Sequence, residues 1–301
     1  ALYPVMAVVG AAATLGAVVI AARHLARTTT REAGLLVALV LVCLPAYWIH
    51  ATSGLETAFV FLFQVILWVA AARLASDDVP RLRPVLLAAL MSALLVVSRT
   101  DGFVLPVIVA LWLVLQRRVG AALAIFAVSG GVFLGQMLAR QAYFGLPMPL
   151  TFYAKVSGDL EQRIASAIRF YGGITLKGNL ALPLVATAVA GLIALRALAG
   201  GWTRFRAALT IELWIFAGLT AYYVAIGGDI YRERFLLILF ATGMVTAFRL
   251  ADGLAPVTAP RALAALAIAA QLVSGVLFDR RLDYVFEFPK YDRAVTIGRY
   301  L

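Results

Sequence analysis

The sequence contains very few residues that bind metals or form disulfides. Cys43 is the only cysteine and lies within an apolar stretch, and His24 and His50 are the only histidines. One cysteine cannot form an intrachain disulfide, and two histidines cannot make a histidine-rich metal centre. We therefore predict neither a disulfide framework nor a metal site built from thiolates or histidines.

Charged residues are also scarce. They make up 14% of the 301 residues, whereas hydrophobic residues make up 63%, and the mean hydropathy of +0.96 is unusual for a soluble domain. Apolar runs of roughly 15 to 22 residues recur from end to end, and a helix of that length crosses a bilayer core of about 30 Å. The composition therefore predicts an all-α, polytopic transmembrane helical bundle.

About ten apolar runs are long enough to be predicted as spans. They cover residues 2–22, 34–49, 57–72, 84–98, 103–116, 120–139, 180–195, 209–226, 235–248 and 262–278. Residues 1–278 then form one transmembrane domain, and residues 279–301 form a short outward tail. The largest outward loop covers residues 141–179, and its middle has the spacing of an amphipathic helix that lies in the membrane interface.

The distribution of arginine predicts the orientation. Most short odd-numbered loops carry two or three arginines, whereas the cations of the even-numbered loops are mostly in the long loop 141–179. The positive-inside rule then places the odd loops in the cytoplasm and the even loops outside, in the periplasm of a bacterial plasma membrane. The net charge of +11 is spread along the membrane rims, which favours lipid headgroups as its partner and not nucleic acid.

Four polar clusters lie in alternate loops. They are SGLE at 53–56, RTDG at 99–102, YFGLPMPLTFYAK at 143–155 and GGDIYRERF at 227–235. A chain that crosses the bilayer at each span puts alternate loops on one face. We therefore expect the four clusters to form a single outward-facing site.

The first two clusters contribute Glu56, Arg99 and Asp101. Ionisable residues close to the hydrocarbon are costly and usually mark a substrate path. A structural alternative stays open, in which Arg99 and Asp101 pair within a tight turn and Glu56 complements the dipole at a helix N-terminus.

The third cluster combines aromatic residues with prolines. Tyr143 and Tyr153 offer ring faces that stack on sugars, and Lys155 adds a point charge suited to phosphate. An aromatic belt at the membrane interface would explain the same tyrosines.

The fourth cluster is the most specific. Its glycines allow close approach of a ligand, Asp229 can orient hydroxyls or a divalent cation, and Arg232 with Arg234 can clamp an anion. A solvated charged turn before a helix is the alternative.

The order of these motifs resembles a known family. The sequence resembles the family of the mycobacterial terminal β-arabinofuranosyltransferase and its bacterial relatives, within the GT-C glycosyltransferases. The resemblance lies in the order SGLE, then R-x-D-G, then a Y-F-G loop running through proline to A-K, then GGD followed by R-F. The resemblance covers most of the chain. Leu150 departs from it, since relatives often have asparagine there, and so does the second arginine after GGD.

The resemblance implies a glycosyltransferase of GT-C fold. Such enzymes move a sugar, with arabinofuranose as the candidate that the resemblance implies, from a polyprenyl-phosphate donor to a cell-envelope glycan outside the cytoplasm. The cations that the leaving phosphate needs are assigned to Arg99, Lys155, Arg232 and Arg234. The sugar or acceptor contacts are assigned to Glu56, Asp101, Tyr143, Tyr153 and Asp229. No protein ligand for a metal is assigned, although a divalent cation on the donor is compatible with the chemistry.

The catalytic base is not assigned to any of these residues. GT-C enzymes carry it as an acidic residue in the first outward loop, and we find no such loop in this sequence. The chain begins at Ala1 with no charged segment before its first apolar run. We therefore expect a fragment that lacks an upstream helix and the loop carrying the base; a removed signal peptide is the alternative.

Two other functions remain open. One is a flippase or transporter of lipid-linked sugars, which would need polar residues reachable from both faces, whereas the polar motifs lie on one face. The other is a membrane factor that keeps a GT-C-like fold without catalysis. A missing acidic residue in the upstream loop of the complete gene would favour this factor.

Overall fold

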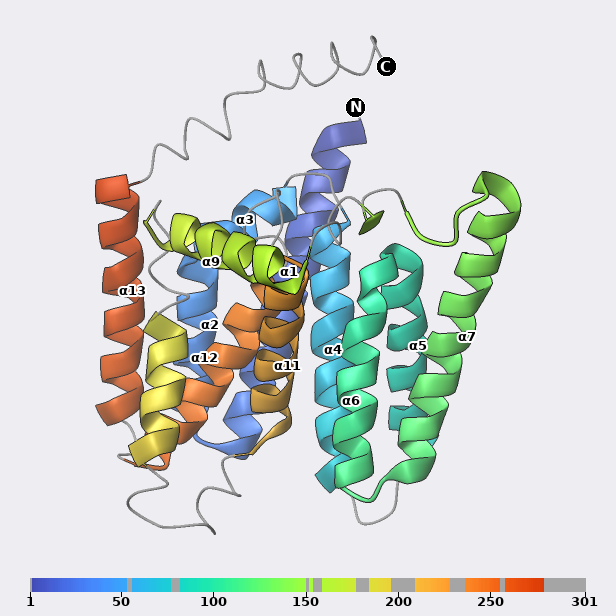
Figure 1. Ribbon diagram of the computed structural model, residues 1–301. Coiled ribbons are helices and arrows are strands. Elements are labelled where there is room, and N and C mark those ends of the chain that lie inside the picture. The colour runs from blue at the N-terminus through green and yellow to red at the C-terminus, as the bar shows by residue number, and fades with distance from the viewer. Residues whose placement is uncertain are drawn as a thin grey trace.

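The computed structural model describes residues 2–52, 56–76, 82–149, 152–153, 159–176, 184–195, 209–227, 236–254 and 258–278. Regular structure in these ranges is entirely helical, which confirms the predicted all-α class (Figure 1). The helices are α1 (Leu2–Thr28), α2 (Arg31–Cys43), α3 (Pro45–Thr52), α4 (Thr57–Ser76), α5 (Leu82–Ser98), the 3-10 helix η1 (Thr100–Phe103), α6 (Val104–Leu115), α7 (Val119–Phe144), α9 (Leu160–Leu176), Leu184–Leu195, α11 (Ile211–Ala225), α12 (Leu237–Asp252) and α13 (Thr258–Phe278).

Three of these helices are long and apolar enough to cross a membrane. They are Pro4–Thr28, Thr57–Ser76 and Val119–Phe144, and the bent pair α2 and α3 would count as a fourth span. By length and composition these are the helices of a membrane protein. The other apolar segments, among them the Thr258–Val273 part of α13, are 10–17 residues long, so the ten-span topology stays a prediction.

Alternate connections lie at opposite ends of the bundle. Figure 1 places the α1–α2 turn and the α6–α7 turn at the lower end of the view. The connection from α5 through η1 to α6 and the C-terminal end of α7 lie at the upper end, and α9 lies across that end. The RTDG turn, the C-terminal end of α7 and α9 therefore share one end, as the alternation of loops predicts.

The bend between α2 and α3 has an identifiable cause. Pro45 has no backbone N–H, so the helical hydrogen-bond ladder is interrupted there, and the two segments meet at 63°. The Trp48 Nε1 donates a hydrogen bond of 2.7 Å to the carbonyl oxygen of Val42, and the Tyr47 hydroxyl donates one of 2.7 Å to the carbonyl oxygen of Leu237. The indole of Trp48 thus satisfies a carbonyl at the break.

Helix α12 lies at the centre of the packing. Nearly every residue from Leu237 to Ala251 is buried, which is expected of a helix that is apolar all round. Helix α7 lies at the edge and exposes large side chains such as Leu123 and Leu138. Helices α4 and α11 lie between these extremes, and both contribute residues to the site described next.

The segment predicted to lie in the interface is helical. Helix α9 begins at Leu160 and ends at Leu176, within the predicted loop. Its Ala167 is fully buried, whereas Leu160 and Ile168 are 55% and 65% exposed. The helix therefore has one small face against the protein and an apolar face pointing away from it. Its predicted position in the membrane interface stays a prediction.

Candidate functional site

Glu56, Arg99 and Asp101 form one ion-pair cluster. The Arg99 Nε and Nη2 donate to the two carboxylate oxygens of Asp101 at 2.9 and 3.1 Å. The Arg99 Nη1 donates to Glu56 Oε1 at 3.1 Å. Glu56 of the SGLE motif and Arg99 of the RTDG turn, which lie 43 residues apart in the chain, therefore meet, as predicted. The pairing of Arg99 with Asp101 that the structural alternative required is also present.

The backbone of the RTDG turn sets this geometry. Helix α5 ends at Ser98 and Arg99 takes an extended conformation, after which residues 100–103 form η1. A Cβ on Gly102 would overlap the carbonyl oxygen of Leu95 and would lie only 2.7 Å from its carbonyl carbon. No residue larger than glycine fits between η1 and the last turn of α5. This close approach holds Arg99 and Asp101 in a fixed relation to α5.

The cluster carries one more negative than positive charge. Burial by itself lowers the pKa of Arg99, but hydrogen bonds from its guanidinium to Asp101 and the charges of Asp101 and Glu56 raise it above its usual value. Arg99 therefore stays protonated at any physiological pH. Two carboxylates already share its guanidinium, so its predicted role in binding the donor phosphate would require competition with both of them.

A small pocket opens beside the cluster. Its polar and aromatic lining comes from α4, η1 and α11, and its apolar lining from α4, α6 and α11. The lining residues are Thr57, Val60, Phe61, Gln64, Arg99, Asp101, Gly102, Leu105, Leu219, Tyr222 and Tyr223. Its volume of about 20 Å³ is enough for a water molecule or the hydroxyl of a ligand, but not for a whole sugar ring.

Tyr222 and Tyr223 are site residues that the sequence analysis missed. Both line the pocket, and their ring centroids lie 5.4 Å apart at an interplanar angle of 56°. They are the last aromatic residues of α11 and lie five and four residues before Gly227, where the GGD motif begins. A tyrosine pair at the end of an apolar span, directly before a predicted site loop, is the signal that could have identified them.

Tyr143 and Tyr153 do not line this pocket. Tyr143 is 82% exposed at the end of α7 and meets Phe144 edge to face, with ring centroids 4.6 Å apart. Tyr153 is 41% exposed and meets Phe152 in the same way at 5.8 Å. Both tyrosines therefore present aromatic surface outside the pocket, as either a stacking platform or an interfacial belt would require.

Four residues of the predicted site lie outside the described residues. They are three of the four predicted phosphate-binding cations, Lys155, Arg232 and Arg234, and the carboxylate Asp229. The described chain reaches Gly227, whose φ of +88° is in the left-handed region that favours glycine. A Cβ there would lie 3.4 Å from the carbonyl oxygen of Arg163 in α9. The GGDIYRERF segment therefore begins directly against α9.

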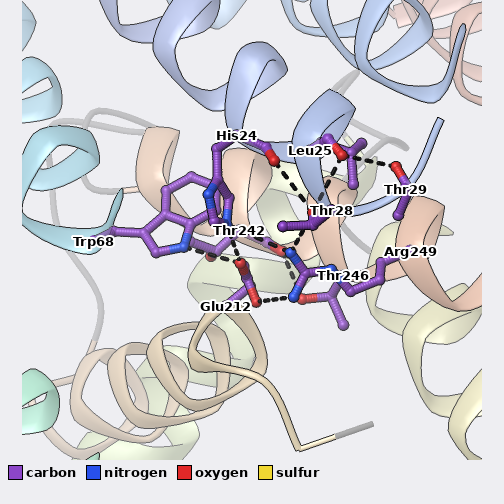
Figure 2. A network of polar contacts seen from close by, with 9 residues as sticks. All are labelled: His24, Leu25, Thr28, Thr29, Trp68, Glu212, Thr242, Thr246 and Arg249. Carbon is purple, nitrogen blue, oxygen red and sulfur yellow. Dashed lines mark hydrogen bonds and ion pairs between the residues drawn. The ribbon is translucent and has the colours of Figure 1, made fainter. Parts of the chain in front are cut away.

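A second charged cluster surrounds Glu212, which is fully buried (Figure 2). One of its carboxylate oxygens lies 2.8 Å from His24 Nε2 and accepts a hydrogen bond of 3.2 Å from Trp68 Nε1. The other accepts a hydrogen bond of 3.1 Å from Arg249 Nη1. The Arg249 Nη2 donates to the Thr28 hydroxyl at 2.7 Å. The network joins α1, α4, α11 and α12.

The Glu212 cluster lies at the end of the bundle opposite the RTDG turn. It involves the C-terminal ends of α1 and α12, and the α1–α2 turn is at the lower end in Figure 1. Each charge has a partner of opposite sign or a hydrogen bond, which is how proteins tolerate buried charges. We assign this cluster a structural role. Within the described residues, no group of three histidine, cysteine, aspartate or glutamate side chains could hold a metal ion.

No protein-family model, curated protein or solved structure matches this chain. In the described residues, the fold itself defines an all-helical class with three helices long and apolar enough to cross a membrane and a polar cluster at one end of the bundle.

Proposed function

We propose that the chain is part of a GT-C-like membrane glycosyltransferase. In this proposal it spans a bacterial plasma membrane about ten times, and its motif loops face the periplasm. It moves a sugar, with arabinofuranose as the first candidate, from a polyprenyl-phosphate donor to a cell-envelope glycan. The observation that carries the proposal is the meeting of Glu56, Arg99 and Asp101 beside a tyrosine-lined pocket.

The reaction requires three kinds of group. The acceptor hydroxyl oxygen bonds to the anomeric carbon, while the bond from that carbon to the phosphate oxygen breaks and the lipid phosphate leaves with the electron pair. Cations stabilise the negative charge that develops on this phosphate. A base takes the proton of the acceptor hydroxyl. Hydroxyl-binding residues hold the sugar in place during the transfer.

The described residues supply the third kind of group. One carboxylate, that of Asp101, lines the pocket together with a threonine hydroxyl, an amide and two tyrosines, and groups of these kinds can form hydrogen bonds or stacking contacts with sugars. We propose that Lys155, Arg232 and Arg234 supply the phosphate contacts. We do not assign the base to Glu56 or Asp101, because each is already bound to Arg99.

A flippase would need a polar path between the two ends of the bundle. Helix α11 connects Glu212 at one end with Tyr222 at the other. Its intervening residues Ile215 and Leu219 are apolar and no more than 2% exposed. The packing along α11 therefore favours the transferase over the flippase.

The proposal is tested by sugar transfer in reconstituted membranes. The full-length protein is placed in liposomes with radiolabelled polyprenyl-phosphate donors carrying arabinofuranose, mannose or glucose, and with arabinan or mannan oligosaccharides as acceptors. We expect labelled product from one donor, and its loss in Arg99→Ala. The matched control is Arg27→Ala, because Arg27 is an exposed arginine at the opposite end of α1 from the proposed site.

Lipid binding separates the alternatives if transfer fails. Protein that binds the lipid donors but transfers none of the sugars would refute the transferase and leave the non-catalytic factor. Movement of labelled donor from the inner to the outer leaflet without transfer would identify a flippase instead.

A further inference from the structure

The hydroxyl of Thr57 has no hydrogen-bond partner among the described residues. Thr57 is 4% exposed, begins α4 directly after Glu56, and lines the pocket. Several threonines inside helices donate to a carbonyl four residues earlier, as Thr242 does at 2.7 Å, whereas Thr14 inside α1 does not. The first residue of a helix has no preceding helical turn to supply such a carbonyl. The position of Thr57 therefore explains why its hydroxyl remains available.

A buried hydroxyl without a partner is unfavourable. Such groups usually bond to the protein, to ordered water or to a ligand, because leaving them unpaired costs about 1–3 kcal/mol. A hydroxyl can donate or accept a hydrogen bond, so it can pair with a polyol hydroxyl that acts as acceptor or as donor. The Thr57 hydroxyl is therefore suited to a ligand group that enters the pocket beside Arg99 and Asp101.

The pairing within the cluster indicates what that ligand group is. Glu56 and Asp101 both bind the guanidinium of Arg99, so a phosphate would have to displace a carboxylate to reach this cation. The carboxylate oxygens of the cluster accept hydrogen bonds from hydroxyl donors, and Gln64 adds an amide that both donates and accepts. Tyr222 adds an aromatic ring against which the apolar face of a sugar can pack.

From these contacts we infer that the pocket binds hydroxyl groups of the donor sugar and that Thr57 helps to determine which sugar is accepted. This inference rests on the proposed function and adds a division of the site: the hydroxylated edge of the sugar enters the pocket, and the phosphate lies outside it. The pocket volume of about 20 Å³ fits one edge of a ring and not the ring itself. Arg99 then positions the two carboxylates and does not contact the phosphate.

The test compares lipids that carry a sugar with the same lipid without one. Binding of polyprenyl-phosphate arabinofuranose, mannose and glucose is measured against the bare polyprenyl phosphate, with full-length protein in nanodiscs. Thr57→Val removes the hydroxyl and keeps the shape. We expect about fivefold to tenfold weaker binding of the preferred sugar lipid and no change for the bare lipid, because one hydrogen bond is lost. Thr57→Ser keeps the hydroxyl and should bind both lipids like the wild type.

Thr14→Val is the matched control. Thr14 is also buried, and its hydroxyl also lacks a partner in the described residues, but it lies on α1 and does not line the pocket. Neither valine variant should lower the melting temperature, since neither removes a hydrogen bond within the described protein. Gln64→Leu provides a second variant in the pocket, with the same selective loss expected.

Three results would count against the inference. Equal weakening for the sugar lipid and the bare lipid would mean that Thr57 acts on the phosphate or on the fold. Unchanged sugar-lipid binding in both Thr57→Val and Gln64→Leu would place the sugar elsewhere, even with transfer intact in the wild type. Failure of the wild type to bind any of these lipids would instead refute the proposed function itself.

Discussion

Glu212→Gln is expected to destabilise the protein strongly. The substitution keeps the size of the side chain and one acceptor oxygen, so Trp68 can keep a hydrogen bond, but it removes the negative charge that faces Arg249 at 3.1 Å and His24 at 2.8 Å. Removing one partner of a buried ion pair typically costs about 3–5 kcal/mol. The Arg249 side chain is 23% exposed, so water partly replaces its lost partner. We therefore expect a loss of about 2–3 kcal/mol.

The matched control is Glu32→Gln. Glu32 pairs with Arg261, whose side chain is 62% exposed, and exposed pairs contribute about 0–1 kcal/mol. The free energy of unfolding is measured for both variants in the same detergent micelles by titration with a denaturing detergent, followed by circular dichroism. The two variants should differ by at least about 1 kcal/mol, although both remove one carboxylate from an arginine.

A double-mutant cycle tests whether the cluster acts as a unit. Arg249→Met alone leaves Glu212 buried without its cationic partner, so it should also destabilise the protein. The double variant Glu212→Gln with Arg249→Met contains neither charge, so neither is left uncompensated. Its loss in the free energy of unfolding should be clearly smaller than the sum of the losses of the two single variants. If the losses simply add, or if Glu212→Gln loses no more than Glu32→Gln, the ion pair contributes nothing specific and our reasoning about this cluster is wrong.

Three further predictions concern the candidate site and the topology. Arg99→Lys should abolish most sugar transfer with little change in binding of the bare polyprenyl phosphate, because a lysine cannot bridge two carboxylates in a bidentate geometry; near-normal transfer rates would contradict this. Gly102→Ala should lower the melting temperature by several degrees, whereas Gly131→Ala should leave it unchanged, since a Cβ on Gly131 meets nothing within 4 Å. In a background with Cys43→Ser, Tyr143→Cys should react with an impermeant thiol reagent from outside, and Arg117→Cys only from the cytoplasm; the reverse pattern would overturn the orientation.

The sequence predicts the helices well because long apolar runs leave the backbone few alternatives in a membrane. Each described helix from α1 to α7 falls on a predicted run, and the bend at Pro45 follows from the missing N–H. The meeting of Glu56 with Arg99 was also predictable, since it depends only on the alternation of loops. Whether ten spans form is a different matter, because several of the helices are short.

Contacts that depend on helix rotation were not predictable. Tyr222 faces the pocket because of how α11 is turned, and an apolar span gives no periodic signal for that rotation. The pairing of Glu212 with His24 joins residues 188 positions apart, and each taken alone looks like an ordinary residue near a membrane rim. Charges inside or beside apolar runs were visible in the sequence, but only the packing of α1 against α12 shows which of them meet.

Helix α11 links the two charged clusters mechanically. Glu212 near its first turn is anchored to three other helices, and Tyr222 lies ten residues further on, which is about 15 Å along the helix axis. Each residue of a helix turns it by about 100°, so a single residue inserted between them would rotate Tyr222 out of the pocket while Glu212 kept its partners. The buried anchor near the first turn of α11 therefore sets the angular position of the tyrosine near its last turn, and a change at either end is transmitted as a rotation.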